Sequence, residues 1–266
     1  VHNHDYIEKA GSVVKKGEKI ISQGDIIDHR DIERLALCRV NSVEVYKRPN
    51  VAIISTGSEL TELYIQQNSV INSNFYMVST FLENKGIPYT YLGIAKDNVE
   101  DIVGKLEDAS ASYDVVVSFG GTAMGKYDLI AEAIRKAGGE IISGGVNCSP
   151  GKTFKIAIVN KKPVFICPGN PASAAVCIEL FLNVFIRKAY YGEDVSFVKA
   201  RSKFSLKKKN GFYKLIPSRV ISRYGELVAF DKFSPKPKNV LFHGLSILKK
   251  GSTSIKEDEL LDVYGI

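Results

Sequence analysis

The sequence lacks a hydrophobic run of the roughly twenty residues that a membrane-spanning helix needs. Its first five residues, 1–5, also lack the charged and apolar pattern of a signal peptide. We therefore expect a cytoplasmic protein without a membrane anchor. An initiating methionine is missing too, because the sequence starts on Val1, and we expect a fragment or a processed form of a longer chain.

Cysteine is scarce, and the four residues present have no close pair in the sequence. This spacing indicates buried, reduced thiols and argues against a disulfide framework or a structural zinc site. The residues concerned are Cys38, Cys148, Cys167 and Cys177.

Acidic residues are outnumbered, which gives a net charge of +7 and suits an anionic ligand. Part of the excess lies in residues 199–209, where Phe204 is the one aromatic residue and the repeated aromatic interleaving that single-strand binders use is absent. We interpret that run as an exposed strand and turn, and we expect no nucleic-acid partner.

Apolar residues make up 45% of the 266 positions, enough for real cores. Strand-like and helix-like patterns alternate between residues 51 and 190, which predicts an α/β fold: a central three-layer domain with a mostly parallel sheet. A partial N-terminal segment precedes it, and a small C-terminal β domain follows. The predicted boundaries are 1–48, 49–193 and 194–266.

Several element ends are predicted from capping residues. Ser73 or Asn74 is expected to cap a helix that runs to Lys85, and Asp97, paired with Glu100, is expected to cap the next. Residues 43–46 alternate like a strand, residues 154–159 and 164–167 have the pattern of a hairpin, and three short strands are expected at 212–216, 227–230 and 240–242.

A glycine-rich turn at residues 115–128 links an apolar strand to a helix, and its backbone N–H groups could hold an anion. Its glycine and lysine spacing is that of a P-loop, but Tyr127 stands where Ser or Thr would bind magnesium. Asp128 could bind a metal or favour the positive end of the helix dipole. The turn alone leaves a ligand site and a plain tight turn equally open.

Two further loops lie near predicted strand ends. Residues 151–153 read Gly-Lys-Thr, but a strand follows and the first P-loop glycine is replaced by Val146, so we reject a nucleotide-binding P-loop here. Residues 168–171 read Pro-Gly-Asn-Pro and begin an apolar helix, with proline at a favourable first position.

Taken in order, these motifs resemble the molybdopterin molybdenumtransferases of the MoeA type, which include the E domain of gephyrin. The resemblance covers most of residues 10–192 and rests on six segments: 56–60, 72–74, 96–98, 120–128, 150–152 and 168–171.

The resemblance implies insertion of molybdenum from molybdate into adenylylated molybdopterin, with release of AMP and with Mg²⁺ as cofactor. It implies catalytic roles for Asp128, Glu59 and Lys152, and metal binding by Asp128, Asp97 and Glu59. The implied ligand-binding residues are Gly120, Gly121, Thr122, Gly125, Ser149, Pro168, Gly169, Asn170, Pro171 and Asn74.

Plainer roles stand beside these. Asp97 could be a pure helix cap, Lys152 a solvated turn lysine, and Asn74 an ordinary cap. The chain also departs from the family: Ser58 replaces a usual Asp, Ser149 a usual Lys and Thr153 a usual Pro.

The family's site is completed across a dimer by an N-terminal part that this chain largely lacks, so we expect a homodimer. Two alternatives stay open: the molybdopterin adenylyltransferase that precedes this step, and a non-catalytic molybdopterin-binding or scaffold protein.

Overall fold

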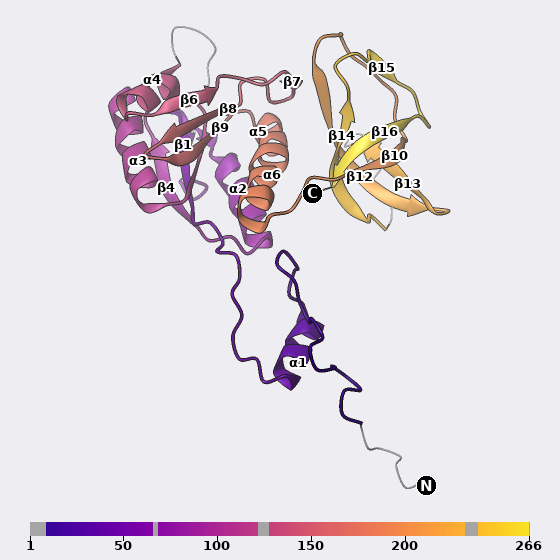
Figure 1. The fold of residues 1–266 in the computed structure, drawn as a ribbon. Coiled ribbons are helices and arrows are strands. Elements are labelled where there is room, and N and C mark those ends of the chain that lie inside the picture. The colour runs from indigo at the N-terminus through magenta and orange to yellow at the C-terminus, as the bar shows by residue number, and fades with distance from the viewer. Residues whose placement is uncertain (1–8, 66–68, 122–127, 232–238, 266) are drawn as a thin grey trace.

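The computed structural model describes residues 9–65, 69–121, 128–231 and 239–265. An extended N-terminal arm (residues 9–50) leads into an α/β body, and a mostly β part follows (Figure 1). None of the described helices is long and apolar enough to cross a membrane.

The α/β body is built on a six-stranded sheet in the order β4-β1-β5-β9-β8-β6. Strands β4, β1, β5 and β9 are parallel, whereas β8 runs antiparallel to both neighbours, as the predicted hairpin requires. The bounds are β1 Val51–Thr56, β4 Tyr89–Ala95, β5 Val115–Phe119, β6 Glu140–Ser143, β8 Lys155–Val159 and β9 Lys162–Cys167. The predicted α/β class with a mostly parallel sheet is therefore confirmed.

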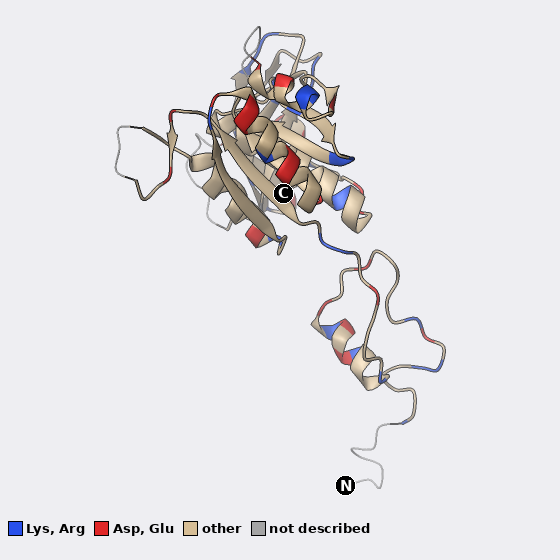
Figure 2. Ribbon diagram, turned by 90° about the vertical axis from the view of Figure 1, so that its left-hand side faces the viewer, with Lys and Arg blue, Asp and Glu red and all other residues tan. Residues whose placement is uncertain are grey.

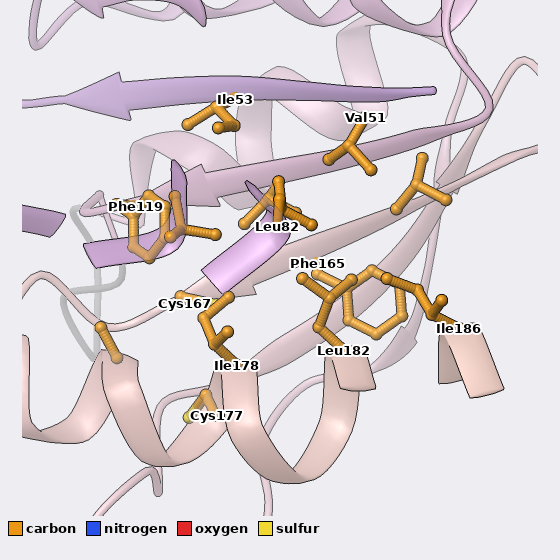
Figure 3. Packing of buried hydrophobic residues seen from close by; sticks show 14 of the residues in the cluster. Val51, Ile53, Leu82, Phe119, Phe165, Cys167, Cys177, Ile178, Leu182 and Ile186 are labelled. Carbon is orange, nitrogen blue, oxygen red and sulfur yellow. The ribbon is translucent and has the colours of Figure 1, made fainter. Parts of the chain in front are cut away.

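Helices cover both faces of this sheet, because its central strands are apolar on both sides. Helices α3 Val99–Ser112 and α4 Leu129–Lys136 pack on one face. The other face is covered by α2 Ser73–Asn84, α5 Pro171–Cys177, the π-helical turn η1 Ile178–Leu182 and α6 Asn183–Tyr191. Figure 3 shows Leu182 and Ile186 of this second layer packed against Phe165 of β9.

Two predicted helix starts are wrong. Helix α2 is preceded by Asn72, whose side chain makes no capping bond, so neither Ser73 nor Asn74 is the cap. Helix α3 is capped by Asn98, which accepts a hydrogen bond from the Asp101 N–H at 2.8 Å. Asp97 and Asn98 are both good capping types, and tertiary contacts of Asp97 decide between them.

The C-terminal strands form a second six-stranded sheet in the order β13-β10-β16-β14-β12-β7. Because β13 also pairs with β12, five of these strands close into a ring. The bounds are β7 Cys148–Ser149, β10 Phe197–Ser202, β12 Tyr213–Arg223, β13 Glu226–Asp231, β14 Phe242–Leu248 and β16 Leu260–Gly265. Two short two-stranded sheets are separate from this sheet: β2 Leu60–Thr61 pairs with β3 Val70–Ile71, and β11 Leu206–Lys207 pairs with β15 Ser254–Ile255. The strand expected at residues 240–242 begins only at Phe242.

The arm carries the helix α1 His29–Leu37, which stands away from the rest of the chain (Figure 2), whereas residues 21–27 of the arm lie next to the body. Asp28 and Asp31 form a reciprocal capping box at its start. The strand expected at residues 43–46 is wrong, because that stretch has no partner strand among the described residues. Apolar side chains along the arm are exposed: Val13, Ile26, Ile32, Leu37, Val40, Val43, Val45 and Tyr46.

Candidate functional site

Three turns meet where the parallel strands β1, β5 and β9 end at their carboxyl edge. Gly57 follows β1, Gly120 follows β5 and Gly169 lies just beyond β9. A Cβ atom built on Gly169 would lie 3.6 Å from the Gly120 Cα atom, so two of the turns are in contact. Ligands of such sheets bind beyond this edge.

The Gly120 turn is packed closely on β1. Its φ is +91°, and a Cβ atom there would lie 2.3 Å from the Thr56 carbonyl oxygen. The Thr56 hydroxyl donates to the Phe119 carbonyl at 2.9 Å, which fixes the end of β5. Gly121 also has a positive φ, of +63°, whereas the expected binding residues Thr122 and Gly125 lie outside the described residues.

The turn of residues 168–171 begins α5 and meets the start of α2. Asn170 caps α5 by accepting from the Ser173 N–H at 3.1 Å, and Pro171 occupies the first turn of the helix. The Asn74 amide donates to the Gly169 carbonyl at 2.8 Å. Its Oδ1 atom is buried and has no hydrogen-bond partner among the described residues, a costly arrangement that a ligand N–H group would relieve.

Asp97 lies beside the Gly57 turn, opposite Ser58. Asp97 Oδ2 accepts from the Ser58 N–H at 2.8 Å, and the Asp97 N–H donates to Ser58 Oγ at 3.0 Å. Glu59 is exposed, and its carboxylate lies close to Gly57. A Cβ atom built on Gly57 would lie 2.8 Å from both carboxylate oxygens of Glu59. Two carboxylates therefore border the same short turn.

Asp128 is engaged on both of its oxygens. Oδ1 accepts from the Ala131 N–H at 3.2 Å and caps α4, while Oδ2 pairs with the buried ammonium of Lys155. Within the four described ranges, no group of three His, Cys, Asp or Glu side chains is placed to hold a metal ion. A metal here would need ligands from the substrate and water as well.

The loop that carries Ser149 and Lys152 is attached to the C-terminal sheet. Strand β7 pairs in parallel with β12, where Ser149 lies in register with Lys214. The Asn147 side chain also donates to the Gly211 carbonyl at 2.9 Å. Lys152 is exposed, and β8, which starts three residues later, begins at the carboxyl edge because it runs antiparallel to β9.

Lys214 is a candidate that the sequence reasoning missed. Residues in register on adjacent strands project from the same face, so its side chain lies beside that of Ser149. Lys214 is half-buried, and its side-chain ammonium makes no hydrogen bond or ion pair with the described part of the chain. The β7–β12 pairing brings it to this loop, and no local sequence pattern predicts a parallel pairing between residues 149 and 214.

A separate hollow of about 850 Å³ lies at the opposite, amino edge of the sheet. It is bordered by residues 21–27 of the arm and by Lys85 and Tyr191 of the body. None of the predicted site residues lines it.

Comparison with known proteins bears on this site. Residues 52–188 match the family described as "Probable molybdopterin binding domain". The chain is 31% identical over 206 residues to a molybdopterin molybdenumtransferase of Nostoc, covering 74% of this chain and 47% of that one. It is 34% identical over 195 residues to a protein of Methanocaldococcus jannaschii named provisionally for molybdopterin biosynthesis, covering 70% and 48%.

A Staphylococcus aureus molybdopterin molybdenumtransferase aligns with 98% of this chain and 64% of its own length, at 26% identity. Among solved structures, a molybdopterin biosynthesis MoeA protein of Pyrococcus horikoshii superposes with a TM-score of 0.76 at 23% identity, covering 92% of this chain and 61% of that chain. The likeness to this structure concerns the fold. The chain spans about half to two thirds of the length of these relatives.

Proposed function

We propose that this chain, which belongs to the molybdopterin-binding domain family, acts in molybdenum cofactor biosynthesis by inserting molybdenum from molybdate into adenylylated molybdopterin, with release of AMP. The observation that carries the proposal is the meeting of the Gly120 and Gly169 turns at the carboxyl edge, beside the unpaired Asn74 oxygen.

The phosphate end of the substrate is assigned to the glycine turn. The Gly120 N–H already donates to the Cys167 carbonyl at 3.2 Å, so Gly120 would shape the turn. The backbone amide of Gly121, with those of Thr122 and Gly125 beyond the described residues, would donate hydrogen bonds to phosphate oxygens. The pterin end is assigned to the turn formed by Pro168, Gly169, Asn170 and Pro171. There the Asn74 Oδ1 atom would accept a hydrogen bond from a ring N–H group, which satisfies an otherwise orphaned acceptor.

The molybdate oxyanion is assigned to the loop of residues 149–152. Lys152 and Lys214 would neutralise its charge, and the Ser149 hydroxyl would donate a hydrogen bond. Placing one of the two cations on β12 means that the C-terminal sheet takes part in substrate binding.

Magnesium is assigned to Glu59 and Asp97. Mg²⁺ is commonly held by one or two carboxylates together with substrate phosphates, and these two groups border the Gly57 turn without a cationic partner among the described residues. When bound, the ion would supply charge neutralisation of the phosphate group that leaves with AMP. The contacts of Asp128 fit a metal ligand less well, and we propose that it holds Lys155 and the start of α4 in place.

The arm motivates a homodimer. Its eight exposed apolar side chains, from Val13 to Tyr46, are unusual for a surface facing water, and a second copy of the chain would cover them. Light scattering on the full chain should give twice the mass of one chain, and substitution of Ile26 and Tyr46 by serine should shift it toward one. A monomeric wild-type chain at micromolar concentration would exclude the dimer.

The proposed compartment is the cytoplasm. Cys148, Cys167 and Cys177 are buried free thiols, and burial raises the pKa of Cys148 to about 11, which keeps it protonated and unreactive. Free thiols are the rule in a reducing compartment.

The function is tested by incubating the chain with adenylylated molybdopterin, Mg²⁺ and molybdate, and measuring AMP. AMP release that requires molybdate supports the transferase. Tight binding of the pterin without AMP release would contradict it.

A further inference from the structure

Four side chains form a continuous hydrogen-bonded chain beneath the segment that carries Glu59. Ser55 Oγ donates to Asn72 Oδ1 at 3.0 Å, Asn72 Nδ2 donates to the Tyr91 hydroxyl at 2.7 Å, and that hydroxyl donates to Glu62 Oε1 at 2.6 Å. The four residues come from β1, the position before α2, β4 and the position after β2. Because each group donates to the next, the bonds reinforce one another.

These hydrogen bonds take precedence over the usual capping role of Asn72. Asn72 stands where an asparagine side chain normally caps a helix, yet its side chain makes no capping bond and binds Ser55 and Tyr91 instead. The Tyr91 ring stacks on Phe75 with centroids 4.0 Å apart. Burial, together with the bond to Glu62, raises the pKa of Tyr91, so the hydroxyl remains a proton donor.

Glu59 lies in the segment of residues 58–62, which is held to the rest of the protein at both of its ends. On one side Ser58 is held by Asp97, and on the other Glu62 is held by Tyr91. The same tyrosine holds Asn72, which immediately precedes the helix that presents Asn74. One hydroxyl therefore connects both the carboxylate segment and the helix start to the sheet.

We propose that Tyr91 is a positioning residue for the carboxyl-edge site: through Glu62 it fixes Glu59, and through Asn72 it fixes Asn74. The inference rests on the proposed function, because it assigns Glu59 to the metal and Asn74 to the pterin. The Tyr91 side chain itself would touch neither the metal nor the pterin.

The test compares Tyr91→Phe with the matched control Tyr89→Phe. Tyr89 lies two residues earlier in β4, hence on the same face, and its hydroxyl donates to Glu83 Oε1 at 2.5 Å. Each variant keeps the ring and loses one Tyr–Glu hydrogen bond, and Tyr91→Phe also loses the bond that the hydroxyl accepts from Asn72. Only Tyr91 is linked to the site.

Three readouts separate positioning from stability: Mn²⁺ binding by electron paramagnetic resonance, the Mg²⁺ dependence of AMP release, and amide exchange over residues 58–62. For Tyr91→Phe we expect about fivefold weaker Mn²⁺ binding, a matching rise in the Mg²⁺ requirement, and faster exchange. Tyr89→Phe should leave all three unchanged and should lose less thermal stability, because its single bond is exposed whereas the two bonds of Tyr91 are partly buried. Glu62→Ala should behave like Tyr91→Phe, and the double variant should be no worse than either single one.

The outcomes distinguish the two levels of the proposal. A wild-type chain that neither binds Mn²⁺ nor releases AMP overturns the proposed function, and the inference with it. A wild-type chain that does both, combined with a Tyr91→Phe variant indistinguishable from Tyr89→Phe, overturns the positioning role alone.

Discussion

Replacing Gly120 with alanine should destabilise the fold by about 3 kcal/mol or more and abolish ligand binding at the carboxyl edge. A methyl group there would lie 2.3 Å from the Thr56 carbonyl oxygen, and Thr56 belongs to the buried strand β1, so neither partner can move cheaply. The displaced turn would also carry its backbone amides away from the phosphate. Urea unfolding and calorimetric titration with AMP measure the two effects.

Gly138→Ala is the matched control. Gly138 also has a positive φ, +71°, but a Cβ atom there meets nothing within 4 Å. Its variant should therefore show only the backbone penalty of about 1 kcal/mol and keep full AMP affinity. Equal stability losses at the two positions would refute the close packing of the Gly120 turn on β1.

Replacing Asp128 with alanine should cost on the order of 3 kcal/mol of stability, because it leaves the buried Lys155 ammonium without its partner and removes the cap of α4. Asp128 is a fifth exposed, which places the loss at the lower end of the range for buried pairs. AMP release should fall together with stability. Chemical denaturation and the AMP assay are run on the same preparation.

The double variant Asp128→Ala/Lys155→Met identifies the cause. Removing the unpaired charge should restore most of the stability, since a buried apolar side chain has no desolvation penalty. If AMP release also returned, a direct chemical role of Asp128 would be refuted. Glu100→Ala, which breaks an exposed pair with Lys136, should change little.

The order of strands and helices in the α/β body follows from local sequence. Runs such as residues 115–117 are buried on both faces, and the turns after them contain glycine or a capping residue, so the alternation is readable without tertiary information. The carboxyl-edge placement of Gly57, Gly120 and Gly169 then follows from parallel pairing. These parts of the site were predictable.

Contacts between segments that are distant in the sequence were not predictable. Aspartate is a residue type that commonly caps helices, so the sequence alone favours Asp97 as the cap. The folded structure shows that the Asp97 carboxylate instead accepts from the Ser58 N–H and that Asn98 caps the helix. Lys155 reaches Asp128 because β8 reverses direction. Lys214 and Tyr91 depend on strand register, which no single segment determines.

The measurement that tests the central claim most directly is the molybdate dependence of AMP release in Lys152→Gln and Lys161→Gln. Both lysines are exposed and flank β8, but Lys152 lies at the carboxyl edge and Lys161 in the turn at the opposite end. Loss of one charge-assisted contact to the oxyanion should raise the molybdate concentration for half-maximal release roughly tenfold or more in Lys152→Gln, and Lys161→Gln should match the wild type. Equal behaviour of the two variants would contradict a molybdate site at the carboxyl edge.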